Sequence, residues 1–287
     1  MRVAVVRSRE PAHSGEADAP LVASLRARGA EAVQPCWDDP EMPWDTFDLV
    51  AVRSTWNYAP RREEFLAWAE GVARTTTVCN PADVLRWNTH KGYLIELEER
   101  GAPVIPTAWL GRGDRVELAA LLAARGWTAA VAKPAVGVGG RGMIRVHPGE
   151  TEHAQPELDR LLADGDVLVQ PYLDTVEKVG ELSVVVIDGE VTHAVRKRPR
   201  EGEYRIHRAR GGSYERVDPG ADAAALARWM VEATGQPLLF ARIDLIEDEV
   251  GALQVVELEA TEPDLYLDVA PEAAEWLADA LLARGDG

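Results

Sequence analysis

Cysteine is scarce in this chain of 287 residues, which has only Cys36 and Cys79. Two isolated cysteines are too few for a disulfide framework or a cysteine-rich zinc site. Long apolar runs are also lacking, and none approaches the roughly 18 residues of a membrane span. The apolar stretch over residues 1–6 stops at Arg7, so it lacks the core of a signal peptide and predicts a buried strand instead. These absences favour a cytoplasmic enzyme.

Positive charge is the next deficit. Lysine and arginine number 31 against 48 aspartates and glutamates, which gives a formal net charge of −17. This balance argues against general affinity for nucleic acid or for an anionic membrane. An acidic protein can still bind a nucleotide if it concentrates basic side chains locally and supplies a metal. Basic residues do cluster over 196–200 and again at Arg205, Arg208 and Arg210.

The first third of the chain predicts a small parallel sheet. Apolar runs typical of strands alternate there with stretches of helical periodicity. Because β-α alternation builds parallel sheets, residues 1–85 are expected to form an N-terminal α/β domain. The remainder has more strands, a helix predicted from Asn88 to Arg100, and a hairpin turn at Asp188-Gly189. It predicts an α+β body with antiparallel sheets, divided into parts over 86–175 and 176–287.

A glycine-rich segment over residues 137–142 reads GVGGRG. It matches the G-x-G-x-x-G pattern, which in dinucleotide-binding folds follows the first strand and opens a helix. Here the alternating, strand-like stretch 143–146 follows, so the pattern does not predict a dinucleotide site. A glycine loop between two antiparallel strands predicts a flap that covers phosphates, with an ordinary hairpin as the alternative. Lys133 favours the flap, because a lysine at the end of a buried strand needs an anion.

Charged residues alternate with apolar ones on two strands near the C-terminus. Arg242 and Asp244 lie two residues apart, as do Glu257 and Glu259, so each pair projects from one face of its strand. If the strands pair through the connection 247–252, a guanidinium and three carboxylates converge. Mg²⁺ prefers a few carboxylates completed by phosphate oxygens and water. We therefore predict a metal site at Asp244, Glu257 and Glu259, against the alternative that the glutamates only face solvent.

The order of these features resembles a known superfamily. A strand lysine, a glycine flap, the segment 170–173 (QPYL), a basic segment, an Arg-x-Asp strand and a Glu-x-Glu strand follow one another. Over about residues 88–262 this order is similar to that of the ATP-grasp carboxylate–amine ligases, near their glutathione-synthetase-like branch. The resemblance implies an α/β domain before an ATP-grasp body. It also implies an ADP-forming enzyme that activates a carboxylate as an acyl phosphate and captures it with a nitrogen nucleophile.

The resemblance also implies the nucleotide site. Phosphate contacts fall on Lys91, Lys133, Gly139, Gly140 and Gly142. Adenine falls at the segment 170–173, where the Gln170 carbonyl and the N–H of Tyr172 or Leu173 would read its edge. The ribose hydroxyls would be bound by Asp174 or by Glu177, and the resemblance does not decide between these two residues. The implied cofactors are ATP and Mg²⁺, expected as two ions, with Mn²⁺ as an alternative.

The metal ligands carried over are Asp244, Glu257 and Glu259, and the catalytic residues are Arg242 and Lys197. These two cations would stabilise charge on the transferred phosphoryl group. The family pattern usually ends in Glu-x-Asn, and Glu259 stands where the asparagine would be. This departure adds a negative charge, which leaves the number and preference of metal ions open.

Four further segments resemble a narrower group, the O-ureido-serine cyclo-ligases that close the D-cycloserine ring. They lie at 53–58, 87–89, 180–183, and 202–205 followed by 211–212. This resemblance implies an intramolecular ligase. An intermolecular amino-acid or peptide ligase and a non-catalytic ATP-binding module stay as alternatives.

A small amino-acid-like substrate is the expected partner. The segment 53–56 follows a predicted strand at its C-terminal end, where ligands bind in open α/β sheets, although a structural turn with a packed tryptophan is the alternative. The predicted substrate residues are Arg53, Ser54, Thr55, Trp56, Arg205 and Gly212. Such ligases are commonly homodimers, so a homodimer is a further expectation, and no nucleic acid or membrane partner is expected.

Overall fold

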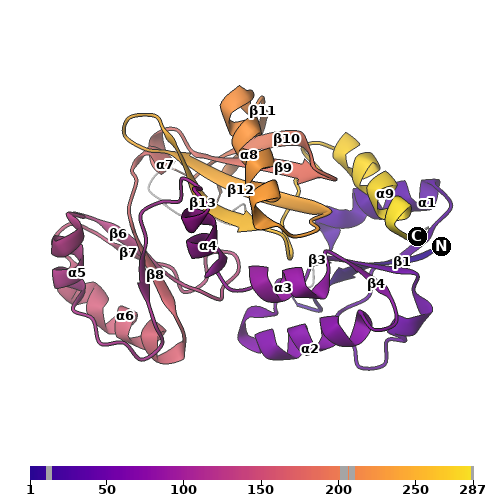
Figure 1. Ribbon diagram of the computed structural model, residues 1–287, viewed down its shortest axis with the longest axis horizontal. Helices are drawn as coiled ribbons and strands as arrows, with labels where there is room; N and C mark the ends of the chain where they lie inside the picture. The colour runs from indigo at the N-terminus through magenta and orange to yellow at the C-terminus, as the bar shows by residue number, and fades with distance from the viewer. Residues whose placement is uncertain (11–14, 201–205, 207–210, 286–287) are drawn as a thin grey trace.

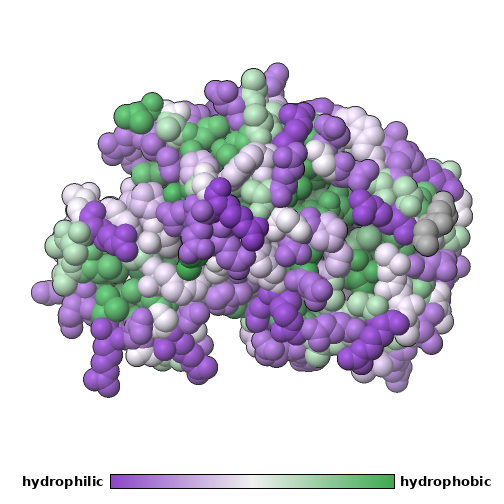
Figure 2. All heavy atoms as spheres, viewed as in Figure 1, coloured by the Kyte–Doolittle hydropathy of each residue, from purple (hydrophilic) through white to green (hydrophobic). Residues whose placement is uncertain are grey.

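A computed structural model describes residues 1–10, 15–200, 206 and 211–285. It contains one parallel and two antiparallel sheets, so the predicted fold class is confirmed (Figure 1). In this described part of the chain, no helix is both long and apolar enough to cross a bilayer. The space-filling view shows a notch at the lower edge between the lobe that carries α5 and α6 and the N-terminal domain (Figure 2).

The N-terminal sheet is parallel, in the order β2-β1-β3-β4. Its strands are β1 (Arg2–Arg7), β2 (Glu31–Val33), β3 (Leu49–Ser54) and β4 (Thr77–Cys79). Its two faces are covered by α1 (Ala19–Ala27) with α9 (Glu272–Gly285) and by α2 (Arg62–Val72). Strand alternation assigns the faces, because Val3 and Val5 pack with α1 and α9 while Ala4 and Val6 pack with α2.

The second sheet is antiparallel, in the order β5-β8-β6-β7. Its strands are β5 (Ala108–Leu110), β6 (Ala130–Pro134), β7 (Ile144–Val146) and β8 (Val167–Pro171). The helices α5 (Leu118–Arg125) and α6 (Thr151–Asp164) share a core with it. The glycine-rich segment joins β6 to β7, and these strands are antiparallel. The prediction of a loop between antiparallel strands is therefore confirmed.

The third sheet is antiparallel, in the order β11-β10-β9-β12-β13. Its strands are β9 (Glu181–Ile187), β10 (Glu190–Arg198), β11 (Ser213–Val217), β12 (Phe240–Glu247) and β13 (Leu253–Glu259), and α7 (Thr175–Lys178) precedes them. Asp188 and Gly189 have φ of 49° and 81° between β9 and β10, as the predicted two-residue turn requires.

One face of the third sheet is apolar and covered by helices. Ala241, Ile243 and Leu245 of β12 share a core with α4 (Tyr93–Glu99) and α8 (Gly220–Thr234). Because strand side chains alternate, Arg242 and Asp244 point to the opposite face. The site therefore lies on the face of this sheet that α8 does not cover.

The predicted helix from Asn88 to about Arg100 is confirmed only from Tyr93 to Glu99, and its predicted start is wrong. The chain forms α3 (Ala82–Asn88) and α4 instead, with a break over residues 89–92. Tertiary hydrogen bonds hold the break open, because the Lys91 N–H donates to the Ala135 carbonyl at 2.9 Å and the Asn88 amide donates to the Leu258 carbonyl at 2.8 Å. The break brings Lys91 to the site.

Asn80 fastens the N-terminal domain to the third sheet. It is fully buried, and its side-chain amide donates to the carbonyls of Phe240 at 2.9 Å and Ala260 at 2.8 Å. Its side-chain oxygen accepts from the Leu239 N–H at 2.6 Å. Three buried backbone groups at the ends of β12 and β13 thus depend on one side chain.

We expect Asn80→Ala to lower the free energy of unfolding by about 2–4 kcal/mol, because it leaves buried backbone groups without partners. Urea denaturation followed by circular dichroism measures this. Asn80→Asp keeps the acceptor but turns a buried carboxylate toward two carbonyl oxygens, so it should be at least as destabilising as the alanine variant at neutral pH. A loss below about 0.5 kcal/mol for the alanine variant, as for an ordinary surface substitution, would contradict this role of Asn80.

Candidate functional site

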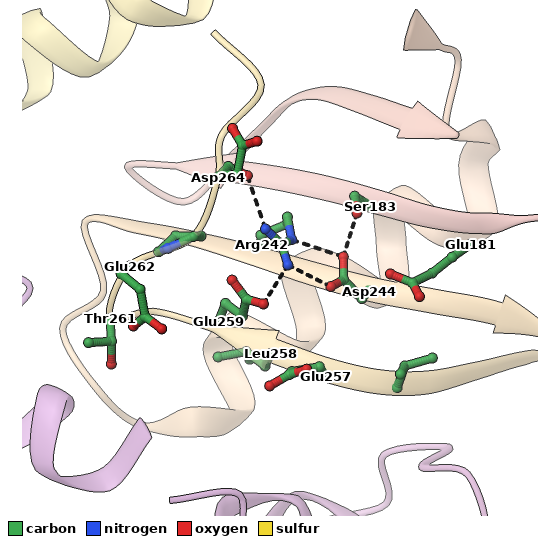
Figure 3. Close-up of polar contacts among 12 residues, drawn as sticks. Glu181, Ser183, Arg242, Asp244, Glu257, Leu258, Glu259, Thr261, Glu262 and Asp264 are labelled. Carbon is green, nitrogen blue, oxygen red and sulfur yellow. Dashed lines mark hydrogen bonds and ion pairs between the residues drawn. The ribbon is translucent and has the colours of Figure 1, made fainter. Parts of the chain in front are cut away.

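The site is built on the pairing of β12 with β13. The antiparallel register places Arg242 opposite Glu259 and Asp244 opposite Glu257. The convergence predicted from the two alternating strands is therefore confirmed (Figure 3). On the other side of β12, the register places Ser183 of β9 opposite Asp244.

Asp244 lies at the centre of a buried charge network. Its carboxylate accepts from Arg242 Nε at 3.0 Å and Nη2 at 2.8 Å, and from the Ser183 hydroxyl. Lys197 Nζ lies 3.4 Å from Oδ1 of Asp244 and also pairs with Glu181. The exposed fractions of Asp244, Lys197 and Arg242 are 4%, 5% and 7%, so these ions depend on one another.

In this network the pKa values of Asp244 and Lys197 are set by the neighbouring opposite charges rather than by burial. Burial alone would raise the pKa of Asp244, but Arg242 and Lys197 outweigh it and hold that pKa below its ordinary value. Burial would likewise lower the pKa of Lys197, yet Asp244 and Glu181 keep it well above the ordinary value. Asp244 and Lys197 therefore both carry their charges at neutral pH.

Two lysines lie beside Glu257. Lys91 Nζ is 2.9 Å from its carboxylate and 3.1 Å from the Gly137 carbonyl, so Lys91 links β13 to the glycine loop. Lys133 Nζ lies 3.5 Å from the Val256 carbonyl, and burial lowers the pKa of this lysine. Gly139, Gly140 and Gly142 in the loop have φ of 61°, 67° and 74°, a backbone region that favours glycine.

Glu259 is held by Arg242, whose Nη2 donates to its Oε1. Burial raises the pKa of Glu259 to about 7, with Arg242 opposing the shift and Glu257 adding to it. An asparagine would carry no charge here. The departure from the family pattern therefore places a carboxyl group that titrates near neutrality among the proposed metal ligands.

The carboxylates of Asp244, Glu257 and Glu259 fit a metal ion that is also coordinated by substrate phosphates. In the described part of the chain, no three histidine, cysteine, aspartate or glutamate side chains form a ready cage for an ion. Asp244, Glu257 and Glu259 instead each hold a lysine or arginine. Their oxygen donors suit Mg²⁺, which is bound by one or two carboxylates together with substrate phosphates and water.

An apolar cluster lies next to Lys133, where adenine was predicted. It contains Ile105, Val176, Ile246, Tyr172, Leu173, Ile206 and Val256. Gln170 is buried beside β5 and donates to the Thr107 hydroxyl at 2.9 Å. The Tyr172 N–H already donates to the Ala129 carbonyl at 3.0 Å, which favours Leu173 as the donor to adenine.

Glu177 and Asp174 differ in their surroundings. Glu177 accepts from the Tyr172 hydroxyl and pairs with Arg145 at 3.0 Å, whereas Asp174 pairs with the exposed Lys178. Arg145 also lies 3.8 Å above the Tyr172 ring. Glu177 is thus the one turned toward the apolar cluster. Arg145 was not predicted as a site residue, although it alternates with apolar residues on β7.

The segment after β3 packs on the loop that follows β13. Arg53 is buried, pairs with Asp18 at 3.1 Å and donates to the Pro263 carbonyl at 2.7 Å. Ser54 donates to Asp18, and Trp56 Nε1 lies 3.4 Å from the Glu262 carbonyl. These residues are therefore next to the proposed metal site, and their contact with substrate stays a prediction.

The two remaining predicted substrate residues, Arg205 and Gly212, fall between β10 and β11 in the sequence. Gly212 immediately precedes β11, in which Tyr214 is in register with Lys197. Arg205 lies outside the residues that the structure describes.

Sequence analysis missed Glu262 and the role of Asn88. Asn88 accepts from the N–H groups of Ala260 at 2.7 Å and Thr261 at 3.0 Å, so it shapes the turn after β13. Glu262 lies on that turn beside Glu259 (Figure 3). The Tyr58 hydroxyl hydrogen-bonds to the Glu262 carboxylate. Burial, reinforced by Glu259, raises the pKa of Glu262 to about 8. Neither contact follows from strand periodicity, which ends at Glu259.

Known proteins match both parts of the chain. The family described as "D-cycloserine synthetase DcsG, N-terminal domain" matches residues 3–80, and "Prokaryotic glutathione synthetase, ATP-grasp domain" matches residues 104–263. The cycloserine biosynthesis protein DcsG of Streptomyces lavendulae is 32% identical over 283 residues, covering 92% of each chain. The crystal structure of D-cycloserine synthetase DcsG superposes with a TM-score of 0.91 at 31% identity, over 99% of this chain and 100% of that one.

A more distant solved structure shares the fold. The ATP-grasp ligase PsnB, complexed with a phosphomimetic variant of its minimal precursor, Mg and ADP, has a TM-score of 0.68 at 20% identity. The alignment covers 99% of this chain and 98% of that one.

We expect Glu262→Gln to change how stability depends on pH. The pKa of Glu262 rises from 4.5 to about 8 on folding, so the folded chain keeps a proton that the unfolded chain has lost. Wild-type stability should therefore fall as pH rises from about 5 to about 8, and the variant should lack this part of the fall. The Tm of the variant minus that of the wild type should thus increase with pH in calorimetry. A difference that stays constant, or that the exposed-site control Glu98→Gln also shows, would contradict this.

Proposed function

Because the chain belongs to the ATP-grasp ligases of the prokaryotic glutathione synthetase type, we propose that it is a cyclo-ligase that converts O-ureido-D-serine to D-cycloserine. It is an enzyme that forms C–N bonds, and such ligases use ATP and Mg²⁺. The match of residues 3–80 to the D-cycloserine synthetase N-terminal family favours ring closure over joining two molecules. That family match carries the proposal, since the glutathione synthetase match alone would suit either reaction.

The nucleotide would occupy the face between the second and third sheets. Adenine would enter the apolar cluster around Ile105 and Ile246, with the Gln170 carbonyl and the Leu173 N–H at its edge and Glu177 at the ribose. The triphosphate would meet Lys91, Lys133 and the N–H groups of the glycine loop. Mg²⁺, expected as two ions with Mn²⁺ as an alternative, would be held by Asp244, Glu257 and Glu259 and would neutralise phosphate charge.

Binding of the triphosphate would exchange charge partners. Lys91 is paired with Glu257, and Arg242 is paired with Asp244 and Glu259. Phosphate oxygens can take over these cations while the released carboxylates turn to the metal. The exchange preserves the balance of charge in a buried site, where an unpaired ion is costly.

Arg242 and Lys197 would stabilise the reacting groups. The substrate carboxylate attacks the γ-phosphorus, ADP leaves, and both cations face the charge that develops on the phosphoryl group. The nitrogen bonded to oxygen in the substrate then attacks the acyl carbon, so a C–N bond forms as phosphate leaves. The product lacks the carbamoyl group of the substrate, so water must also cleave the bond between that group and the ring nitrogen. This hydrolysis leaves N–H on the ring and releases carbamate, which decomposes to carbon dioxide and ammonia.

An intermolecular ligase is the second candidate, because the ATP-grasp part of the chain matches glutathione synthetases. An added amine distinguishes the two reactions, since ring closure needs none.

The homodimer expected from the resemblance stays a prediction.

We expect phosphate release with ATP, Mg²⁺ and O-ureido-D-serine, with D-cycloserine as product and no need for an added amine. Arg242→Ala should lower kcat by about 100-fold or more, because a buried cation that faces developing charge is lost. A phosphate assay coupled to mass spectrometry of the product measures both. Arg228→Ala, on the exposed surface of α8, is the matched control and should keep wild-type activity. An absolute requirement for an added amine would overturn ring closure.

We expect Glu259→Asn to remain active but to need roughly tenfold more Mg²⁺ for half-maximal rate, because one anionic ligand is lost. Titration of the phosphate-release rate with Mg²⁺ measures this. An unchanged Mg²⁺ requirement would show that the Glu259 charge is not used in metal binding.

A further inference from the structure

Glu262 occupies the junction between the N-terminal domain and the strands that carry the proposed metal site. Its exposed fraction is 8%, and it lies three residues beyond Glu259 on the turn after β13. The Tyr58 hydroxyl hydrogen-bonds to its carboxylate, and Trp56 approaches its carbonyl. Both of these aromatic residues come from the segment that follows β3.

Glu262 differs from the other buried carboxylates around it in its lack of a cation. Asp18, Glu181, Asp244, Glu257 and Glu259 each pair with a lysine or an arginine. Within the described residues, no basic nitrogen lies within 4.0 Å of the Glu262 carboxylate, and Tyr58 is a neutral partner. The positive charge of Lys91 opposes the rise in the pKa of Glu262, but its ammonium group is paired with Glu257. A buried carboxylate without a cation is costly, and its raised pKa expresses that cost.

The facing segment also carries polar atoms that are left without partners. Arg53 Nη1 and Thr55 Oγ1 are buried and have no hydrogen-bond partner among the described residues. Arg53 is fixed next to the Glu262 turn by its bond to the Pro263 carbonyl. A donor and a hydroxyl group with unused hydrogen-bonding capacity thus accompany the uncompensated carboxylate at one junction.

The chemistry of an amino acid fits this arrangement. The amino nitrogen and the carboxyl carbon are both bonded to Cα, so they lie only about 2.5 Å apart. When the carboxylate is presented to Arg242, the ammonium must therefore lie close to it. The Glu262 turn meets this requirement, because Arg242 Nη1 donates to the Asp264 carbonyl at 3.2 Å, two residues beyond Glu262.

We propose that Glu262 is the specificity residue that receives the α-ammonium group of the substrate, with Tyr58 holding its carboxylate in place. This inference rests on the proposed function, since it deepens the description of the same site. The ammonium supplies the cation that Glu262 lacks, so substrates need a free amino group. Carboxylic acids without it, or with an acylated nitrogen, would bind poorly however well the rest of the molecule fits.

The test compares pairs of compounds that differ only in the ammonium group. O-ureido-D-serine is paired with 3-(ureidooxy)propanoate in the phosphate-release assay. D-serine is paired with 3-hydroxypropanoate in calorimetric binding to enzyme loaded with AMPPNP and Mg²⁺. Wild-type enzyme should prefer the amino compound in each pair. Glu262→Gln keeps the size and the hydrogen bond to Tyr58 but should raise KM and Kd for the amino compounds by about 10- to 100-fold, with a smaller change in kcat.

The deamino compounds serve as the internal control, because their KM and Kd should be unchanged or lower in Glu262→Gln. Glu98→Gln, on the exposed face of α4, should behave as the wild type in both assays. A uniform loss for amino and deamino compounds would show a merely structural role and overturn the proposal. Wild-type enzyme that does not distinguish the members of either pair would overturn it too.

Failure of the proposed function gives a different result. If O-ureido-D-serine is not converted but D-serine binding still depends on Glu262, the cyclo-ligase assignment fails and the ammonium site stands. If O-ureido-D-serine is converted and Glu262→Gln keeps the wild-type preference, the ammonium site fails and the cyclo-ligase stands.

Discussion

The contact between Asp244 and Arg242 is the interaction on which the site depends. Two bonds join their side chains on one strand, and Ser183 and Lys197 approach the same carboxylate from β9 and β10. Removing one partner of a buried ion pair typically lowers the free energy of unfolding by about 3–5 kcal/mol. These charged groups therefore favour the observed register of the strands that carry them. The positions of β9, β10, β12 and β13 are thereby tied to a charge pattern as well as to apolar packing.

The same network explains how a strongly acidic chain keeps a site for a polyanion. The net charge of −17 would repel ATP if it were spread evenly over the surface. Lys91, Lys133, Lys197 and Arg242 are instead gathered at one place, where nearby carboxylates hold three of them. The cations are thus positioned by the protein's own carboxylates, and two of these, Asp244 and Glu257, are proposed ligands of the accompanying metal.

Those parts of the site that rest on local periodicity could be predicted from the sequence. Alternation on β12 and β13 gave the shared face of Arg242, Asp244, Glu257 and Glu259, and the short connection implied their antiparallel pairing. The Asp188-Gly189 turn was predictable because its backbone conformation demands such residues.

Apart from Arg145, the missed features depend on contacts between distant segments. The break before Lys91 exists because the Asn88 side chain donates a hydrogen bond to the Leu258 carbonyl. Helical propensity depends on local sequence and cannot predict such a bond. Glu262 acquires its environment from Tyr58 on the N-terminal domain. Periodicity within a segment gives no information about such partners.

The position of α9 has a consequence for the order in which the chain folds during synthesis. The helix α9 lies beside α1 (Figure 1). It fills one face of the first sheet, where Leu277 and Leu281 share a core with Val3 and Leu21. The four strands of that sheet precede α9 in the chain, yet the core of the sheet is complete only when residues 272–285 have emerged. The N-terminal domain therefore stays partly uncovered during synthesis until α9 has emerged.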